Sequence, residues 1–225
     1  MIEALFPPDV IALRATAAMA NEPLHPDEAR DANRMSVDRR REFALGRAVA
    51  RHALAKLGVS DAVIPRGADR APCWPAGVVG SLTHSGEFCA VAVAWREPVV
   101  GLGIDVEQDT PLSPRAMARI CTERERIHLA TLPPLPAGSW EKLVFSAKES
   151  FYKCYYGLTH TKLGFRDAEI TFAPDEGSFV AHLLRADAPD ALGTRRFPGR
   201  FALAAPYLAT AVTLRRGDLD VLPAD

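Results

Sequence analysis

The chain has 225 residues, of which 48% are hydrophobic and 24% charged, and its formal net charge is -1 at pH 7. This length suits one large domain or two small ones packed together, and the composition is that of an ordinary globular enzyme. The balanced charge provides no broad basic field, so we expect no nucleic-acid partner, and an anion site must come from local clustering.

The cysteines are scattered and form no C-x-x-C pair: Cys73, Cys89, Cys121 and Cys154. We therefore expect neither a zinc site nor a disulfide framework, but isolated core cysteines in a reducing cytosol. The N-terminus carries Glu3 and Asp9 and lacks the basic and then apolar segments of a secretory signal. Because no apolar stretch is long enough to span a bilayer, we expect a cytoplasmic protein without a membrane span.

The first clear element is a helix from Ser36 to Leu57, which Ser36 caps and Gly58 ends. Before it, prolines interrupt residues 1–35, and Arg14–Ala20 fits a strand as well as a helical turn. The apolar residues of the helix recur at helical spacing and predict its core face: Phe43, Ala50, Leu54 and Leu57.

The middle of the chain predicts a loop followed by strands. Residues 61–79 hold several prolines and glycines, which is typical of a loop. Three strands are predicted after it, the first two joined by a tight turn at residues 85–87: Val78–His84, Phe88–Trp95 and Val99–Val106.

The second half begins, after a loop at 108–115, with two helices separated by a proline-rich break at 133–136: Ala116–Leu132 and Trp140–Tyr156. Four strands are predicted beyond them: Asp167–Phe172, Phe179–Leu184, Arg200–Ala205 and Leu208–Arg215. Each half thus places a helix before a hairpin rich in small apolar residues, as in Cys89–Ala94 and Ala209–Thr213. A duplicated α+β architecture would explain this repeat and would place the active site in the cleft between the halves.

Gly101–Glu107 is an apolar stretch that ends in two acids. Residues two apart on a strand point to the same face, so Asp105 and Glu107 project together. Adjacent carboxylates repel unless a proton or cation lies between them, and Mg²⁺ binds such oxygens together with water and phosphate. Taken alone, the pattern fits ordinary surface acids better than a metal site.

The predicted helix that follows carries Glu149 and Lys153, which are four residues apart and share a face. One interpretation is an exposed ion pair between the two side chains. The other is that Glu149 is a third metal ligand or a general base, flanked by two phosphate-binding lysines, Lys148 and Lys153. The segment alone does not decide between these interpretations.

Candidate phosphate-binding residues precede the acids. Arg40, Arg47 and Arg51 fall on one stripe of the first predicted helix, and the forked guanidinium suits phosphate oxygens. A solvated basic face is the common alternative. Gly80–Gly86 adds hydroxyls, backbone N–H groups and His84 at the end of a strand, although a lone histidine beside a turn is more often structural.

Four segments in this order resemble the Sfp/EntD-type 4′-phosphopantetheinyl transferases: R-R-R-E-F-A-L-G-R (39–47), A-P-C-W-P-A-G-V-V-G-S-L-T-H-S (71–85), G-I-D-V-E (103–107) and F-S-A-K-E-S-F-Y-K (145–153). No single segment is diagnostic, but the ordered combination is highly specific and spans most of the chain.

The resemblance implies an α+β, pseudo-twofold duplicated fold of two similar subdomains, each with a small antiparallel sheet packed on helices, and an active site in the cleft between them. Residues 1–101 would hold the coenzyme A phosphate clamp, and residues 102–225 would hold the metal and the catalytic carboxylates. Family members of this length, with both halves in one chain, are usually monomers, so we expect a monomer.

The implied activity is that of a holo-carrier-protein synthase. It transfers the 4′-phosphopantetheine group of coenzyme A to a serine of an apo acyl, peptidyl or aryl carrier protein, releases 3′,5′-ADP and depends on Mg²⁺. The closest pattern is that of the EntD-like branch, which indicates siderophore, polyketide or lipid synthesis. A phosphohydrolase or nuclease using the same acids, or a non-catalytic coenzyme A-binding module, would be the alternatives.

The resemblance also assigns roles to residues. The metal ligands would be Asp105, Glu107 and Glu149, and the catalytic residues would be Glu149, Lys153 and Asp105. Coenzyme A would contact the following residues: Arg39, Arg40, Arg47, Arg66, Arg70, Thr83, His84, Asp105, Lys148, Glu149 and Lys153.

Three assignments stay open. The family pattern favours Arg39 where the helical stripe favours Arg40, and Arg66 and Arg70 are equally well placed in their loop. Glu125, close to Glu123, resembles an acid near the metal in some members. A carrier-docking patch has these candidates: Arg115, Arg119, Arg124 and Arg126.

Overall fold

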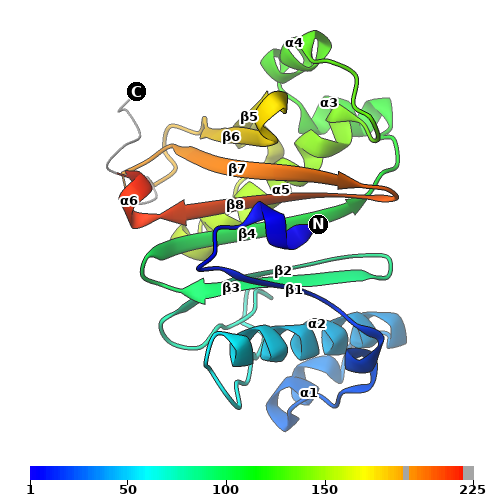
Figure 1. Ribbon diagram of the computed structural model, residues 1–225, viewed down its shortest axis with the longest axis vertical. Coiled ribbons are helices and arrows are strands. Elements are labelled where there is room, and N and C mark those ends of the chain that lie inside the picture. Colours follow the sequence, from blue (N-terminus) through cyan, green and yellow to red (C-terminus); the bar gives the residue numbers. More distant parts are fainter. Residues whose placement is uncertain (190–192, 220–225) are drawn as a thin grey trace.

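Two antiparallel sheets lie side by side through the molecule, and each packs against a helix of 20 residues (Figure 1). The structure, a computed structural model, describes residues 1–189 and 193–219. The first sheet has the strand order β1-β3-β2, and the second has the order β4-β8-β7-β6-β5. The mixed α+β class expected from the sequence is therefore confirmed.

The N-terminal half contains the first sheet and the helices around it. Helix α1 was not predicted; it begins at a proline and is capped by His25 and Glu28. Helix α2 agrees with the prediction, because the Ser36 hydroxyl accepts a hydrogen bond from Arg39 N and Gly58 has a positive φ. The elements are η1 (Ile2–Leu5), β1 (Ile11–Arg14), η2 (Ala17–Asn21), α1 (Pro26–Ala32), α2 (Val37–Lys56), β2 (Val78–Ser85) and β3 (Phe88–Trp95).

The C-terminal half contains the second sheet, with α5 across one face of it (Figure 1). The single helix predicted for Ala116–Leu132 is wrong: the chain is extended at Cys121, and Thr122 with Glu125 forms a capping box that starts a new helix. The elements are β4 (Val99–Gln108), α3 (Pro114–Ile120), α4 (Glu123–Thr131), α5 (Trp140–Thr159), η3 (Phe165–Asp167), β5 (Ala168–Ala173), η4 (Pro174–Glu176), β6 (Ser178–Leu183), β7 (Arg196–Ala204), β8 (Tyr207–Arg215) and α6 (Arg216–Leu219).

Hydroxyl groups join the two sheets where β2 runs beside β4. The backbone N–H groups of Ile104, Val106 and Gln108 donate to side-chain oxygens two residues apart on β2, at 3.1–3.2 Å: Ser81, Thr83 and Ser85. Because residues two apart on a strand share a face, one face of β2 satisfies the exposed edge of β4. These contacts fix the position of Asp105 relative to the N-terminal half.

Small residues allow close packing at this junction. Ala90, Ala92 and Ala94 of β3 lie in the same buried cluster as Ala209 and Ala211 of β8. The alternate residues of β3 belong to a separate cluster beneath α2, so β3 is buried on both faces. The alanine-rich segments noticed in both halves of the sequence are thus where the halves meet.

Gly103 lets α5 lie directly on β4. A Cβ added at this position would overlap the carbonyl oxygen of Ser150, and one added at Gly101 would lie 2.9 Å from Sγ of Cys154. The close approach brings the α5 side chains Glu149 and Lys153 beside the acids of β4. The expected division after residue 101 falls inside β4, which begins at Val99, and it stays a prediction.

No helix within the part of the chain that the structure describes is long and apolar enough to cross a membrane.

Candidate active site

A cavity of about 630 Å³ lies between α2, β2, the 66–77 loop and α5. Seven cationic and two acidic side chains from the described residues line it. The cationic ones are Arg39, Arg47, Arg66, Arg70, Arg96, Lys153 and Lys162, and the acidic ones are Glu42 and Asp69. The cavity is large enough for a ligand of cofactor size, and its excess of cations favours an anionic one.

Arg39 and His84 form one side of the cavity. Nη1 of Arg39 lies 2.7 Å from Nε2 of His84 and 2.8 Å from a carboxylate oxygen of Glu42. Arginine only donates hydrogen bonds, so Nε2 of His84 is the acceptor in a neutral ring. Burial lowers the pKa of His84; the negative charge of Glu42 opposes this effect, and the positive charge of Arg39 adds to it. The imidazole is therefore neutral at pH 7, and it forms part of the cavity wall.

Arg47 lies deeper in the cavity wall and has few protein partners. Only 4% of the residue is exposed, and its buried Nε has no hydrogen-bond partner among the described residues. The guanidinium lies over the Phe43 ring, 4.3 Å from its centroid. Burial lowers its pKa to about 10, with Glu28 and Asp31 opposing the shift. A buried guanidinium of this kind requires an anionic partner, which a ligand could provide.

The arginine stripe predicted from the sequence is only partly correct. Nε and Nη2 of Arg40 donate to the carbonyl oxygen of Ala32 in α1, each at 3.2 Å, and Arg40 is not part of the cavity wall. Arg51 binds Glu28 of α1 at 2.7 Å. Both side chains hold α1 against α2. The prediction that Arg40 binds phosphate is therefore wrong, whereas Arg39 lines the cavity and remains a candidate phosphate ligand.

The sequence left open whether Arg66 or Arg70 contacts phosphate. Both side chains line the cavity, so both are candidate phosphate ligands. Their loop is fixed by an antiparallel bridge between Arg66 and Pro72 and by a hydrogen bond of 2.8 Å from Arg66 N to Asp31. Arg70 has a positive φ of 76° at the turn of this loop.

Lys153 connects the cavity to the acids. It lines the cavity, and its Nζ lies 2.8 Å from Oδ1 of Asp105 and 2.9 Å from the carbonyl oxygen of Ile104. Thr83 also donates to Oδ1 of Asp105, at 3.3 Å. Oδ2 of Asp105 is buried and has no hydrogen-bond partner within the described residues. One oxygen of this carboxylate is thus held by the protein and the other is free.

Thr83 differs from its predicted role as a phosphate contact. It is 3% exposed, lies outside the cavity wall and uses its hydroxyl to bind Val106 N and Asp105. It therefore positions Asp105, while its neighbour His84 points to the cavity because adjacent strand residues face opposite sides.

The other two acids lie near Asp105. Glu107 accepts a hydrogen bond from Nζ of Lys142 at 3.1 Å, whereas Glu149 is half-buried and forms no ion pair within the described residues. Burial raises the pKa of both carboxyl groups, and repulsion from Asp105 raises each further. An incoming cation would relieve this repulsion.

Within residues 1–189 and 193–219, no group of three or more His, Cys, Asp or Glu side chains is arranged to hold a metal ion by itself. The expected set of Asp105, Glu107 and Glu149 is therefore not assembled in advance. The free Oδ2 of Asp105 and the partner-free Glu149 do suit a cation that takes one or two carboxylates and completes its shell with water and substrate phosphate, as Mg²⁺ does.

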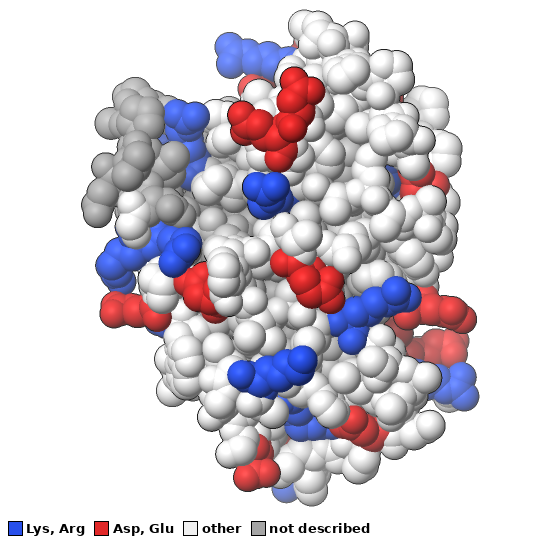
Figure 2. All heavy atoms as spheres, viewed as in Figure 1, with Lys and Arg blue, Asp and Glu red and all other residues white. Residues whose placement is uncertain are grey.

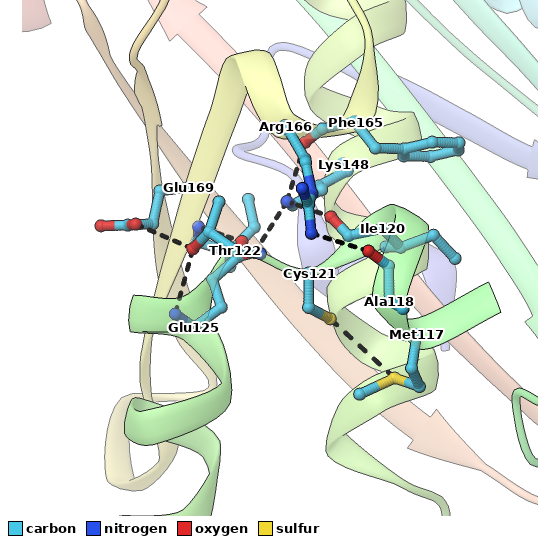
Figure 3. A network of polar contacts seen from close by, with 11 residues as sticks. Met117, Ala118, Ile120, Cys121, Thr122, Glu125, Lys148, Phe165, Arg166 and Glu169 are labelled. Atoms are coloured by element: carbon cyan, nitrogen blue, oxygen red, sulfur yellow. Dashed lines mark hydrogen bonds and ion pairs between the residues drawn. The ribbon is translucent and has the colours of Figure 1, made fainter. Parts of the chain in front are cut away.

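Lys148 is part of a different, buried network (Figure 3). Its Nζ donates to the carbonyl oxygens of Ile120 and Phe165 and to Oε2 of Glu125, at 2.7–2.8 Å. Glu125 also accepts from the backbone N–H groups of Thr122 and Ile170. Three acceptors saturate the ammonium group, so the predictions that Lys148 faces phosphate and that Glu125 lies near a metal are wrong.

The sequence interpretation missed Lys142 and the cavity aromatics Trp74, Tyr152 and Tyr156. Lys142 lies seven residues before Glu149, two helical turns away on the same face, and this spacing could have revealed it. Elsewhere, basic and acidic side chains are interspersed over the face shown in Figure 2, in agreement with the formal net charge of only -1.

Two family models match this chain. One is the 4'-phosphopantetheinyl transferase N-terminal domain, over residues 27–94, and the other is the 4'-phosphopantetheinyl transferase superfamily, over residues 101–205.

Similar proteins include three curated relatives. The 4'-phosphopantetheinyl transferase Svp of Streptomyces mobaraensis is 39% identical over 95% of this chain and 89% of its own length. PptT of Mycobacterium tuberculosis is 40% identical over 71% of each chain. Enterobactin synthase component D of Salmonella typhimurium is 37% identical over 65% of this chain and 59% of the relative.

Proposed function

Because the chain belongs to the 4'-phosphopantetheinyl transferase superfamily, we propose that it transfers the 4′-phosphopantetheine group of coenzyme A to a serine hydroxyl of an apo carrier protein and releases 3′,5′-ADP, with Mg²⁺ as the cofactor. This makes it a holo-carrier-protein synthase.

The observation that carries the proposal is the continuity between the cationic cavity and the acids. Lys153 belongs to both, because it lines the cavity and binds Asp105 at 2.8 Å. A molecule with several phosphates in the cavity would therefore extend to the carboxylates. This supports coenzyme A as the ligand, with its phosphates along Arg39, Arg47, Arg66 and Arg70.

The reaction is an attack of a serine hydroxyl on the phosphorus that carries the pantetheine group. The P–O bond of the pyrophosphate breaks and 3′,5′-ADP leaves through its 5′-phosphate, a step that depends on positioning and charge neutralisation. The arginines would hold the nucleotide end, and Lys153 would lie beside the pyrophosphate. Asp105, Glu107 and Glu149 would hold Mg²⁺ together with pyrophosphate oxygens and water. When bound, the metal ion supplies neutralisation of charge on the leaving 5′-phosphate of 3′,5′-ADP.

Glu149 is the proposed general base. Its carboxylate has no protein partner among the described residues, so it is free to accept the serine proton. Burial and repulsion from Asp105 raise its pKa, which makes it a better proton acceptor than an exposed glutamate. Lys153 compensates part of the negative charge on this face.

The carrier and the pathway are inferred from one relative and from the exposed arginines of α3 and α4. A relative named enterobactin synthase component D supports a siderophore pathway, and the alternatives are polyketide and lipid carriers. The carrier would dock on the exposed arginines of α3 and α4, which could face an acidic recognition helix: Arg115, Arg119, Arg124 and Arg126.

The test is incubation of the enzyme with coenzyme A, Mg²⁺ and apo peptidyl, aryl or acyl carriers, followed by intact mass measurement of the carrier. We expect one phosphopantetheine group on the carrier serine, and no product with EDTA in place of Mg²⁺. Release of phosphate or a nucleotide without carrier modification would favour a phosphohydrolase. Binding of coenzyme A without any product would favour a non-catalytic binding module.

A further inference from the structure

One cysteine of the four differs from the rest. Cys89, Cys121 and Cys154 are buried, and burial raises their pKa values to about 12, 11 and 12. Cys73 is exposed and lines the cationic cavity. Since thiol reactivity depends on access and on the thiolate form, Cys73 is the thiol that reagents in solution reach.

The loop that carries Cys73 is held in place. Cys73 N donates to the carbonyl oxygen of Pro65 at 2.9 Å, and Gly67 N donates to Ala71 at 2.8 Å. The next residue, Trp74, packs so closely on Gly80 that a Cβ there would lie 2.6 Å from the indole ring. A group attached to Cys73 would therefore stay at the cavity rather than move away with its loop.

An independent feature of the same cavity points to an anionic ligand beside this thiol. Arg47 is 4% exposed, lines the cavity with Cys73 and leaves Nε without a partner among the described residues. Cys73 is near enough to act electrostatically on Arg47, although burial remains the main influence on that guanidinium. The positive charge of the cavity wall attracts anionic reagents to this thiol.

We propose that Cys73 is a site of reversible modification by phosphate-bearing low-molecular-weight disulfides, of which coenzyme A disulfide is the representative, and that the adduct closes the cavity. The Cys73 thiolate attacks one sulfur of the disulfide, and the sulfur–sulfur bond of the reagent breaks. A protein–S–S–R bond forms, and the other half leaves as a thiolate that takes up a proton. The protein thiol is oxidised as half of the reagent is reduced.

This inference rests on the proposed function only for the identity of the excluded ligand, coenzyme A. The modification itself follows from an exposed thiol, a fixed loop and a cationic wall. It would make transfer activity sensitive to the ratio of oxidised to reduced coenzyme A, because the same metabolite would be substrate in one form and inhibitor in the other.

The first experiment measures the modification by intact mass and peptide mapping. Reduced protein is treated at low salt with coenzyme A disulfide or with neutral hydroxyethyl disulfide. We expect one adduct per chain, on Cys73, removable by dithiothreitol, and formed on the order of tenfold faster with the anionic reagent. Adducts on the buried cysteines of the folded protein, or equal rates with both reagents, would overturn the proposal.

Matched variants test the role of the cavity charge. Arg66→Gln removes a cation from the cavity wall, whereas Arg41→Gln removes one from an exposed position of α2 outside it. We expect the preference for coenzyme A disulfide to fall toward unity in the first variant and to stay unchanged in the second. An equal effect of both changes would mean that the cavity does not select the reagent.

The second experiment measures coenzyme A binding by calorimetry before and after treatment. The wild-type adduct should lose at least about tenfold in affinity, which corresponds to 1.4 kcal/mol. Cys73→Ser treated identically should keep the affinity it had before treatment. Unchanged affinity of the adduct would overturn cavity closure. A protein that forms the adduct but never bound coenzyme A would instead contradict the proposed function.

Discussion

The two halves of the molecule use a helix of the same length for different purposes. Helix α2 presents Arg39 and Arg47 to the cavity, whereas α5 presents Glu149 and Lys153 to the acids of β4. The N-terminal half therefore offers positive charge for an anion, and the C-terminal half offers carboxylates. Neither half holds a complete site, so the hydroxyl-joined strands β2 and β4 determine whether the two sets of groups work together.

This comparison predicts a division of effects. Changes in the C-terminal half should mainly reduce turnover, and changes in the N-terminal half should mainly reduce affinity for coenzyme A. Changes at the junction between the halves should mainly reduce the free energy of unfolding, with smaller effects on turnover and affinity.

Among the changes that test this division between the halves, the largest effect is expected from Lys153→Met. It removes the group that binds Asp105 and lies between the cavity and the acids, so kcat should fall by about 100-fold or more. Steady-state kinetics with an apo carrier provides the measurement, and Lys56→Met, at the exposed end of α2, is the control. If KM rises and kcat is unchanged, Lys153 only binds the substrate, and the proposed division between a binding half and a catalytic half is wrong.

The next effect is expected from Arg47→Gln. The missing charged contact should weaken coenzyme A binding by about 1.5–3 kcal/mol with little change in kcat. Arg40→Gln is the matched change on the same helix. It should leave the affinity unchanged and lower stability by about 1 kcal/mol, because Arg40 binds Ala32 and not the ligand. Equal affinity losses, measured by calorimetry, would contradict the assignment of Arg40 to α1.

A smaller but distinct effect is expected from Gly103→Ala. The added methyl group would overlap Ser150, so the free energy of unfolding should fall by about 1–3 kcal/mol or more. Gly157→Ala on α5 meets no neighbouring atom and should instead raise it by about 0.5–1 kcal/mol. Urea unfolding compares the two. Destabilisation by both changes would show that the close packing of α5 on β4 is not the cause.

The smallest activity effect is expected from Thr83→Val. Val106 N would lose its hydrogen-bond partner and Asp105 one of its two contacts, which should cost about 1–3 kcal/mol of stability. Turnover should fall less than in Lys153→Met, because the ammonium group still binds Asp105. Ser85→Ala, at the exposed end of the same row, should have less effect on stability. If the variant loses affinity for coenzyme A without losing stability, Thr83 contacts a phosphate of the ligand, as predicted from the sequence.

The sequence predicted what local patterns encode. Caps and apolar spacing predicted α2 and α5 nearly to their ends, and alternation with turn residues predicted β2, β3 and β4. The order of four motifs pointed to the family, and Arg39, Arg47, His84 and Lys153 do line the cavity.

What the sequence could not provide are contacts between distant residues. Arg40 was misassigned because α1, its partner, was not predicted, and a helical stripe alone does not tell which side meets a ligand. Lys148 and Glu125 are 23 residues apart and pair in the interior, which no spacing rule reveals. Gly103 was taken as part of an apolar strand, although its function is to admit α5.

Glu149→Gln tests the central claim most directly, because it separates folding, binding and chemistry. The raised pKa of Glu149 means that folding favours its protonated form, so its contribution to stability is present below pH 4.5 and is lost as pH rises. Glutamine resembles that protonated form. The variant without ligand should therefore have a higher Tm than the wild type at pH 7, with a difference that vanishes as the pH falls toward 4.5.

The decisive measurement combines coenzyme A affinity and carrier modification for Glu149→Gln at pH 7, beside Glu123→Gln as an exposed control. The account predicts near wild-type affinity with turnover reduced by about 10²–10⁴-fold. A variant that modifies the carrier at the wild-type rate would contradict the assignment of Glu149 as the base.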